Sequence, residues 1–362
     1  MKKPVKLIAG LCALALLLSG CSSSVSSSES IAAQDIKDAV LSNLSGDCAD
    51  YSVNYETAVK DVQRNLDFTS TVALSDDSTK CTLTANDIPN YDFNDGTGRF
   101  AEDATEQDIN LTIARNPSKS TPTTELSLFN YSAVMLNGVV LDQVANGCYA
   151  PDDASADSDG NIANGCGLWT DWRLDPLGKV SLGTDSHNAH VQPGGLYHYH
   201  GDPRALYDLT DTSHASPVIG FAADGFPIYG TFFLNEATGE VEEATSGYTL
   251  KTGSRPTGEN NPGGTYDGTY IQDYEFTDAG TLDKCNGMTV NGQYGYYVTK
   301  SYPYVMGCYS GTPDLSFFKF WGVAIPAISA FAIVGTLLIV VAFVLIRRRR
   351  IRRNVATVGS SL

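Results

Sequence analysis

Two apolar segments, one near each end, limit which part of this chain can fold as a water-exposed domain. Residues 323–346 are 24 consecutive positions without a charged side chain, and six arginines follow between Arg347 and Arg353. Such a length matches the apolar thickness of a bilayer, and the arginines indicate the cytoplasmic side. The sequence therefore predicts a membrane helix at 323–346 and a basic cytoplasmic tail at 347–362.

The first 20 residues have the features of an export signal. Lys2, Lys3 and Lys6 precede an apolar run that is too short to span a bilayer, and Leu-Ser-Gly follows before Cys21. This pattern predicts a signal peptide at 1–20 with a lipidation site at Cys21. The Ser-rich residues 22–33 are expected to be a flexible tether. We expect anchoring in the cell membrane by the lipid, by the C-terminal helix or by both, with the ectodomain outside the cytoplasm, periplasmic or at the cell surface.

The predicted ectodomain is strongly acidic. Three of the 24 basic residues lie in the signal and six in the tail, whereas all 41 acidic residues lie between them. The remaining 15 cations against 41 anions give a formal charge of −26. This charge repels nucleic-acid phosphates, so we exclude nucleic acid as a partner and leave a protein or glycan partner open.

Six cysteines remain in the ectodomain, and none of them forms a Cys-x-x-Cys pair. An exported chain with an even number of cysteines is expected to form disulfides. We predict sequential pairs because each encloses a short loop: Cys48 with Cys81, Cys148 with Cys166, and Cys285 with Cys308.

The ectodomain sequence divides by its pattern near residue 80. Residues 34–79 carry apolar side chains at helical spacings, such as Ala58, Val62 and Leu66, and predict a small helical segment. Residues 80–312 contain short apolar or aromatic runs separated by turn residues, which predicts many short strands. We therefore expect a mainly β, sandwich-like domain stapled by disulfides, with an α+β arrangement as the alternative. One partial echo, between residues 194–200 and 291–297, predicts two equivalent strands.

All five histidines lie between His187 and His214. In a strand, His198 and His200 project from one face, and the Pro-Gly-Gly turn at 193–195 can fold His187 and His190 back against them. Imidazoles suit Cu(II) or Zn(II), so we predict that His187, His190, His198 and His200 form a divalent-metal site. Asp185, Asp202 and Asp224 are candidates to orient the rings from behind.

Other interpretations of these patterns stay open. The histidines can be structural residues of a cell-surface adhesion module that binds a protein or glycan, or part of a hydrolase that uses a His/Asp pair. The acidic loop with Asp152, Asp153, Asp157 and Asp159 lacks the full calcium-loop pattern, so calcium is the less favoured ion. Whether the protein is an enzyme is left undecided.

Residues 195–200 form the motif Gly-Leu-Tyr-His-Tyr-His, and further motifs lie at residues 81–90, 136–139, 190–193, 221–230, 282–287 and 302–304 with Cys308. Over residues 80–310, these motifs resemble the YHYH domain family, which is named after its Tyr-His-Tyr-His tetrapeptide. The resemblance implies an exported or surface protein and no particular reaction. Two departures stand out: Tyr91 replaces a histidine that follows Ile-Pro-Asn in the family, and Gly295 and Tyr297 replace those of a second YHYH-like strand.

Overall fold

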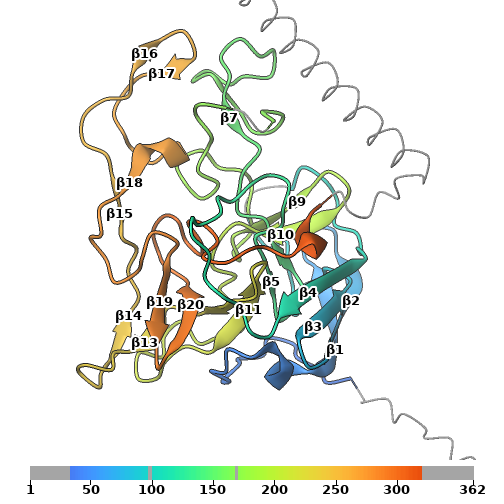
Figure 1. Cartoon of the computed structure of the whole chain (residues 1–362). Helices are drawn as coiled ribbons and strands as arrows, with labels where there is room; N and C mark the ends of the chain where they lie inside the picture. The colour runs from blue at the N-terminus through green and yellow to red at the C-terminus, as the bar shows by residue number, and fades with distance from the viewer. Residues whose placement is uncertain (1–32, 97–99, 168–169, 320–362) are drawn as a thin grey trace, which may run out of the picture. The chain divides into compact units, whose positions relative to one another are not determined.

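The computed structural model describes residues 33–96, 100–167 and 170–319, which form a mainly β structure (Figure 1). None of the helices in these ranges is long and apolar enough to cross a membrane. The predicted signal peptide, Cys21, the membrane helix at 323–346 and the basic tail lie outside the described residues, as does the tether except for its last residue.

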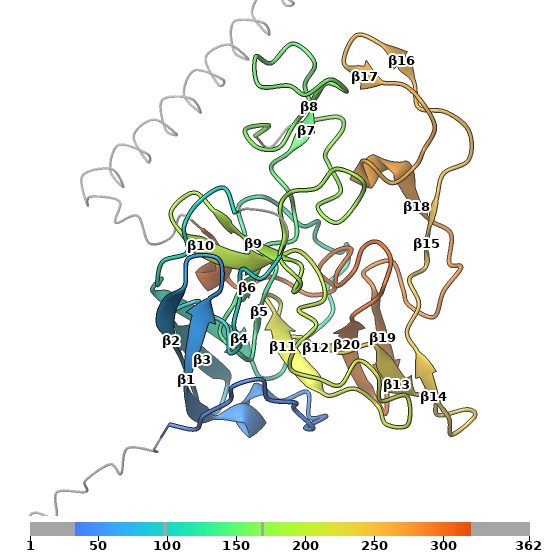
Figure 2. The same cartoon turned by 180° about the vertical axis from the view of Figure 1, so that it is seen from behind.

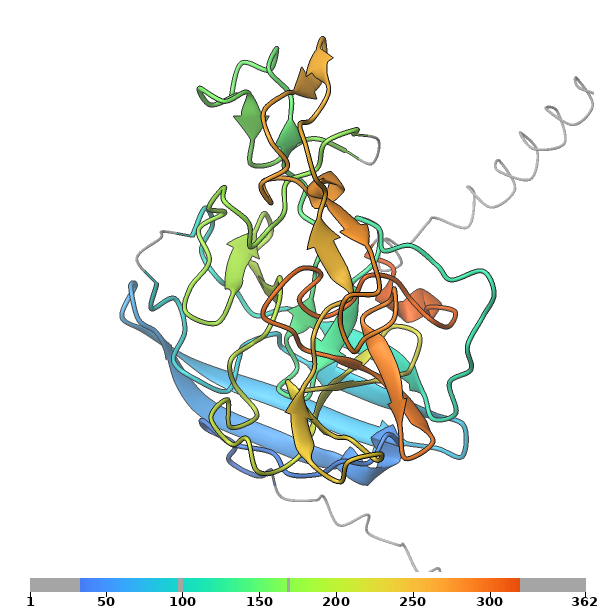
Figure 3. The same ribbon diagram turned by 90° about the vertical axis from the view of Figure 1, so that its left-hand side faces the viewer.

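A four-stranded antiparallel sheet, with the order β1-β2-β3-β4, begins the domain. Figure 3 shows its blue strands running side by side. The strands are β1 (Val53–Asp61), β2 (Leu66–Asp76), β3 (Lys80–Ala85) and β4 (Ile109–Ala114).

An eight-stranded sheet has the order β19-β20-β12-β11-β5-β6-β10-β9, and the labels of Figure 2 follow this order from β19 at the right to β6. Its strands are short: β5 (Ala133–Met135), β6 (Val140–Leu141), β9 (Ala189–Gln192), β10 (Leu196–Tyr199), β11 (Val218–Ala222), β12 (Pro227–Tyr229), β19 (Gly287–Val290) and β20 (Gln293–Tyr297).

The remaining described elements are two-stranded ribbons and single turns of 3-10 helix. The ribbons pair β7 (Cys148–Tyr149) with β8 (Asn161–Ile162), β13 (Phe232–Leu234) with β14 (Val241–Glu243), β15 (Tyr248–Leu250) with β18 (Tyr274–Phe276), and β16 (Thr257–Gly258) with β17 (Asn261–Pro262). The 3-10 helices are η1 (Cys48–Tyr51), η2 (Ile271–Asp273) and η3 (Leu315–Phe317).

The two larger sheets bury their side chains in one hydrophobic core. Val72 and Leu83 of the four-stranded sheet belong to the same buried cluster as Val134 and Tyr199 of the eight-stranded sheet. The turn between β5 and β6 approaches the smaller sheet so closely that a Cβ on Gly138 would lie 2.6 Å from the Ala85 Cβ. Glycine is therefore required there, and its φ of +83° is one that side chains rarely adopt.

The helical segment predicted for residues 34–79 is wrong. This region forms β1 and β2, with η1 before them. Val62 and Leu66, which fitted a helical spacing, are 45% and 46% exposed, whereas Thr57, Val59 and Asp61 alternate inward along β1. Burial therefore alternates every second residue, as in a strand, and does not follow the spacing of three or four residues expected for a helix. The boundary at residue 80 also falls inside a hairpin, because β3 pairs with β2.

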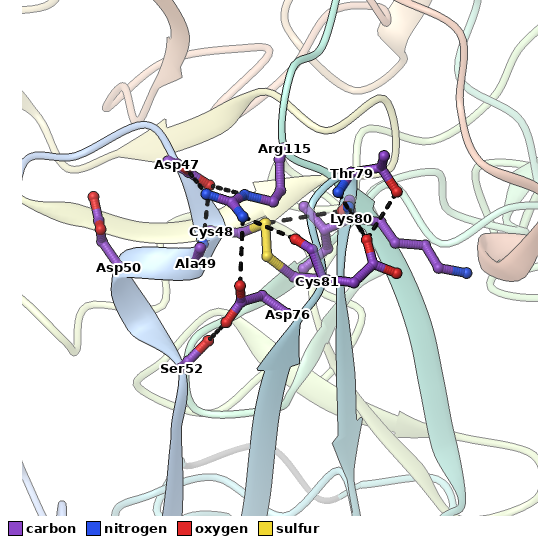
Figure 4. The surroundings of a disulfide bond; sticks show 12 residues. Asp47, Cys48, Ala49, Asp50, Ser52, Asp76, Thr79, Lys80, Cys81 and Arg115 are labelled. Carbon is purple, nitrogen blue, oxygen red and sulfur yellow. Dashed lines mark hydrogen bonds and ion pairs between the residues drawn. A yellow bond between two sulfur atoms is a disulfide. The ribbon is translucent and has the colours of Figure 1, made fainter.

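All three sequential disulfides form, as predicted: Cys48–Cys81, Cys148–Cys166 and Cys285–Cys308. The first joins η1 to β3 (Figure 4). Beside it, the Arg115 guanidinium lies 2.6 Å from an Asp47 carboxylate oxygen and 3.4 Å from one of Asp76. The covalent bond and these ion pairs fix the start of the domain to the sheet.

The eight-stranded sheet consists of two equivalent halves that meet where β5 pairs antiparallel with β11. In each half, a hairpin (β5–β6 or β11–β12) is followed by a second hairpin (β9–β10 or β19–β20) whose last strand pairs parallel with the first hairpin. The turns agree in detail, since Met135 N donates to Val139 O and Ala222 N to Phe226 O, both at 2.9 Å. The predicted equivalence of residues 194–200 and 291–297 is confirmed.

Candidate metal centre

The hairpin β9–β10 carries the histidines that the sequence singled out. His198 lies directly opposite His190 in the antiparallel pairing, and His200 follows the end of β10. Gly194 and Gly195 make the turn, with φ values of +99° and +83°. A Cβ on Gly195 would lie 2.1 Å from the Thr105 hydroxyl, so the turn is also packed against the chain before β4.

Three imidazole rings meet on one side of this hairpin. The ring centroids of His190, His198 and His200 are 4.8 Å apart in each of the three pairs, and the rings are steeply inclined to one another. Each histidine offers a nitrogen within 4.8 Å of the other two, and the Nε2 atoms of His190 and His200 lie 3.1 Å apart. This triangle is the arrangement expected of three histidine ligands on one ion.

Backbone carbonyls hold two of the three rings. The Nδ1 of His190 lies 2.6 Å from Leu182 O, and the Nδ1 of His198 lies 3.3 Å from Leu196 O. A ring that donates from Nδ1 keeps the lone pair of Nε2 free for a metal. The Nδ1 of His200 is buried without a hydrogen-bond partner.

Burial keeps the three rings in the form that binds metals. His198 and His200 are 2% and 3% exposed, and His190 is half-buried. Burial lowers the pKa of His190, and it holds the pKa of His198 and His200 well below the usual 6.5, with neighbouring histidines adding to the effect. The rings are therefore neutral at neutral pH, and only the neutral ring can donate its lone pair to a metal.

The structure brings together three of the four predicted metal ligands and places His187 elsewhere. The His187 ring stacks on Tyr91 at a centroid distance of 3.6 Å, and its Nδ1 lies 2.7 Å from Pro203 O. His187 precedes β9 in a turn, where Asn188 has a φ of +57°, so its side chain does not follow the alternation of the strand. His214 contacts Asp211 on an exposed turn, with Nδ1 2.8 Å from the carboxylate.

A known protein family matches the part of the chain that contains the three clustered histidines. A model of the family described as YHYH protein matches residues 110–311, which is more than half of the chain and includes the three clustered histidines. The chain belongs to the YHYH family. No curated protein and no solved structure matches it.

The tyrosines of the YHYH motif lie on the other face of β10 from the histidines. Tyr197 and Tyr199 are fully buried, and the Tyr91 hydroxyl lies 3.2 Å from the first and 2.6 Å from the second. Asn137 donates to the Tyr199 hydroxyl at 2.9 Å. The sequence reasoning missed Asn137, although it follows directly on the Met135-Leu136 run and precedes a turn glycine. The motif thus combines a hydrogen-bonded tyrosine face with a histidine face.

The three predicted orienting carboxylates do not contact the rings of the centre. Asp185 accepts hydrogen bonds from the Tyr197 hydroxyl and the Asn94 and His187 backbone, and Asp202 accepts them from Tyr207 and the Arg204 backbone. Asp224 lies in the other half of the sheet. In the described chain, backbone carbonyls take the orienting role instead, which no side-chain pattern could have indicated.

The second half of the sheet lacks the histidines of the YHYH strand. The pairing of β19 with β20 and of β20 with β12 places Met288, Gly295 and Tyr297 at the positions of His190, His198 and His200. The Tyr297 ring stacks on Tyr229 at 5.0 Å and 16°. Aromatic side chains therefore occupy the region equivalent to the metal centre.

Two further groups of potential ligands lie away from the three histidines. Asp47 lies beside Cys48 and Cys81, but both sulfur atoms are used in the disulfide (Figure 4). Within the described ranges, the aspartates of residues 152–159 do not gather into a group that could hold an ion. Asp153 and Asp157 instead accept hydrogen bonds from their own loop, which explains the acidic pattern without calcium.

Proposed function

We propose that this YHYH family member is a membrane-anchored protein whose extracytoplasmic domain binds one Cu(II) or Zn(II) ion. The ligands are His190, His198 and His200. The observation that carries the proposal is the triangle of rings, because three imidazoles spaced 4.8 Å apart and held neutral by burial have the chemistry of a metal site.

The distance between the two facing nitrogens supports the same conclusion. Zinc–imidazole bonds are about 2.0–2.1 Å long, so two nitrogens on one tetrahedral ion lie about 3.3 Å apart. The observed 3.1 Å between His190 Nε2 and His200 Nε2 is close to this separation. The described chain offers three side chains at the centre, which leaves a fourth position for water or another small ligand.

The experiment is a metal titration of the full-length chain in detergent. After equilibration with Cu(II) or Zn(II) and removal of excess ion, mass spectrometry should find one ion per chain in the wild type. The double variant His198→Ala/His200→Ala should lose it. His214→Ala is the matched control, because this ring lies on an exposed turn.

His187→Ala separates a three-histidine site from the four-histidine site that the sequence suggested. Because the His187 ring stacks on Tyr91, this variant should keep the ion. An unchanged metal content in the His198→Ala/His200→Ala variant, or none in the wild type, would refute the proposal.

The anchors need a separate test. We propose that the uncharged segment 323–346, lipidated Cys21 or both hold the domain outside the cytoplasm. Cell fractionation of Cys21→Ala, of a chain ending at residue 322 and of their combination should show which change releases the protein. Retention of the combined variant in the membrane fraction would contradict both anchors.

A further inference from the structure

The described chain ends in a short segment that is fixed to the domain. This segment, Asp314 to Lys319, is called the stem here and contains η3. The Thr112 amide donates to the Ser316 hydroxyl at 2.8 Å, the Tyr131 amide to Phe317 O at 3.0 Å, and the Lys319 amide to Phe129 O at 2.8 Å. The stem is therefore bound to the domain along its length, with Phe317 fully buried.

The stem ends close to the metal centre. The Lys319 ammonium forms an ion pair with Asp142, and the two side chains are only 14% and 4% exposed. The Asp142 amide donates at 2.9 Å to the carbonyl of Tyr199, and His200 is the next residue. One ion pair and one backbone hydrogen bond thus connect the last described residue to the end of β10, which carries His198 and is followed by His200.

The distance from the stem to the predicted membrane segment is limited by the chain itself. Val323 is the first residue of the predicted membrane helix at 323–346, four positions after Lys319. Four residues span at most about 14 Å, even when fully extended. Because the stem is bound to the domain and the connection to the predicted membrane helix is so short, the domain has little freedom to turn its metal centre away from the membrane.

We propose that the stem holds the histidine centre at the outer surface of the membrane, next to the lipid headgroups. This inference rests on the proposed function, since it requires both the metal and the membrane segment. Its consequence is that a partner exchanging metal or electrons with the centre would meet it at the lipid surface rather than in open solution.

The test uses the paramagnetism of Cu(II). Full-length protein is reconstituted into vesicles containing a phospholipid with a nitroxide on its headgroup, and the spin–lattice relaxation time of the nitroxide is measured. Loading with Cu(II) should shorten this time, whereas the same protein loaded with diamagnetic Zn(II) is the matched control. Equal relaxation with the two ions, at one bound ion per chain, would overturn the inference.

A second variant tests the stem itself. An insertion of about 20 Gly/Ser residues directly after Lys319 adds roughly 25 Å of average reach without changing the domain. The insertion should abolish the Cu(II)-dependent shortening while the copper content stays the same. Undiminished shortening in this variant would overturn the role of the stem. Absence of bound copper in the wild type is seen independently by mass spectrometry and would refute the proposed function itself.

Discussion

The Nε2 atoms of His190 and His200 lie 3.1 Å apart, a separation at which the two rings share either one proton or one metal ion. The His190 ring is oriented by Leu182 O, which lies 2.6 Å from Nδ1. When Nδ1 carries the hydrogen, the Nε2 of His190 can only accept. Metal binding at this position therefore requires the hydrogen of His200 to move from Nε2 to Nδ1, which has no other hydrogen-bond partner, so that both facing lone pairs are free.

Protonation of the neutral rings to imidazolium, which removes their free lone pairs, predicts how metal binding depends on pH. Burial lowers the pKa of His190, His198 and His200 below the usual 6.5, so protons compete with the metal only in more acid solution. Metal content should stay constant from about pH 8 to pH 6.5 and fall only below that range. Equilibrium dialysis against a fixed free Zn(II) concentration would measure it. A decline that begins above pH 6.5 would contradict the neutral, buried state of the rings.

Gly295→Ala is expected to destabilise the second half of the sheet. A Cβ at this position would lie 2.5 Å from a ring carbon of Tyr229, and that ring is stacked on Tyr297. Overpacking of this kind costs about 1–3 kcal/mol. Urea unfolding should show a smaller cost for Gly295→Ala in a Tyr229→Ala background, because the obstructing ring is absent. Equal costs in both backgrounds would show that the ring does not exclude the side chain.

The cluster of histidines could be predicted because its information is local. His198 and His200 share a face through the two-residue period of a strand, and the Gly194-Gly195 turn returns the chain to place His190 opposite His198. The prediction that His187 joins these three rings is wrong. Asn188 has a left-handed backbone conformation, so the strand alternation that places His190 does not extend back to His187.

The rest of the centre depends on contacts between distant parts of the chain. Leu182 contributes only a carbonyl, which any residue can offer, so its role has no signature in the sequence. Tyr91 and Lys319 reach the YHYH strand or its neighbour across more than a hundred positions. In residues 34–79, the apolar side chains fit both a helical spacing of three or four residues and the two-residue alternation of strands. The strands form because β1 pairs with β2 and β2 pairs with β3.

Loss of the Cys48–Cys81 disulfide is expected to lower the free energy of unfolding substantially. The bond closes a loop with a sequence separation of 33, and both cysteines are buried. Chain-entropy arguments give about 3–4 kcal/mol for such a loop. Denaturant unfolding of Cys48→Ser/Cys81→Ser would measure the loss, with an Asp47→Asn variant as the control that weakens the adjacent ion pair with Arg115 but keeps the bond. A loss below about 1 kcal/mol would contradict the expected restriction of the unfolded chain.

Asp224→Asn tests whether an asparagine can replace the aspartate that contacts the buried tyrosine in the second half of the large sheet, as Asn137 does in the first half. The turn equivalence places Asp224 at the position of Asn137, and each contacts the tyrosine of its own half: Asn137 donates to the Tyr199 hydroxyl, and Asp224 accepts from the Tyr296 hydroxyl at 2.6 Å. The other oxygen of Asp224 is buried without a hydrogen-bond partner. Burial raises the pKa of this carboxyl above its usual value of 3.8.

A carboxyl whose pKa is raised in the folded state contributes stability that is complete below the unfolded pKa and is lost as the pH rises through the folded pKa. The wild type should therefore lose stability relative to Asp224→Asn as the pH rises above 3.8. The gap should grow by at most about 1.4 kcal/mol per pH unit until the folded pKa is passed. Urea unfolding at several pH values would measure it, with Asp108→Asn as the exposed control. A difference between wild type and Asp224→Asn that stays constant with pH would show that Asp224 is charged in the folded protein and gains compensating contacts.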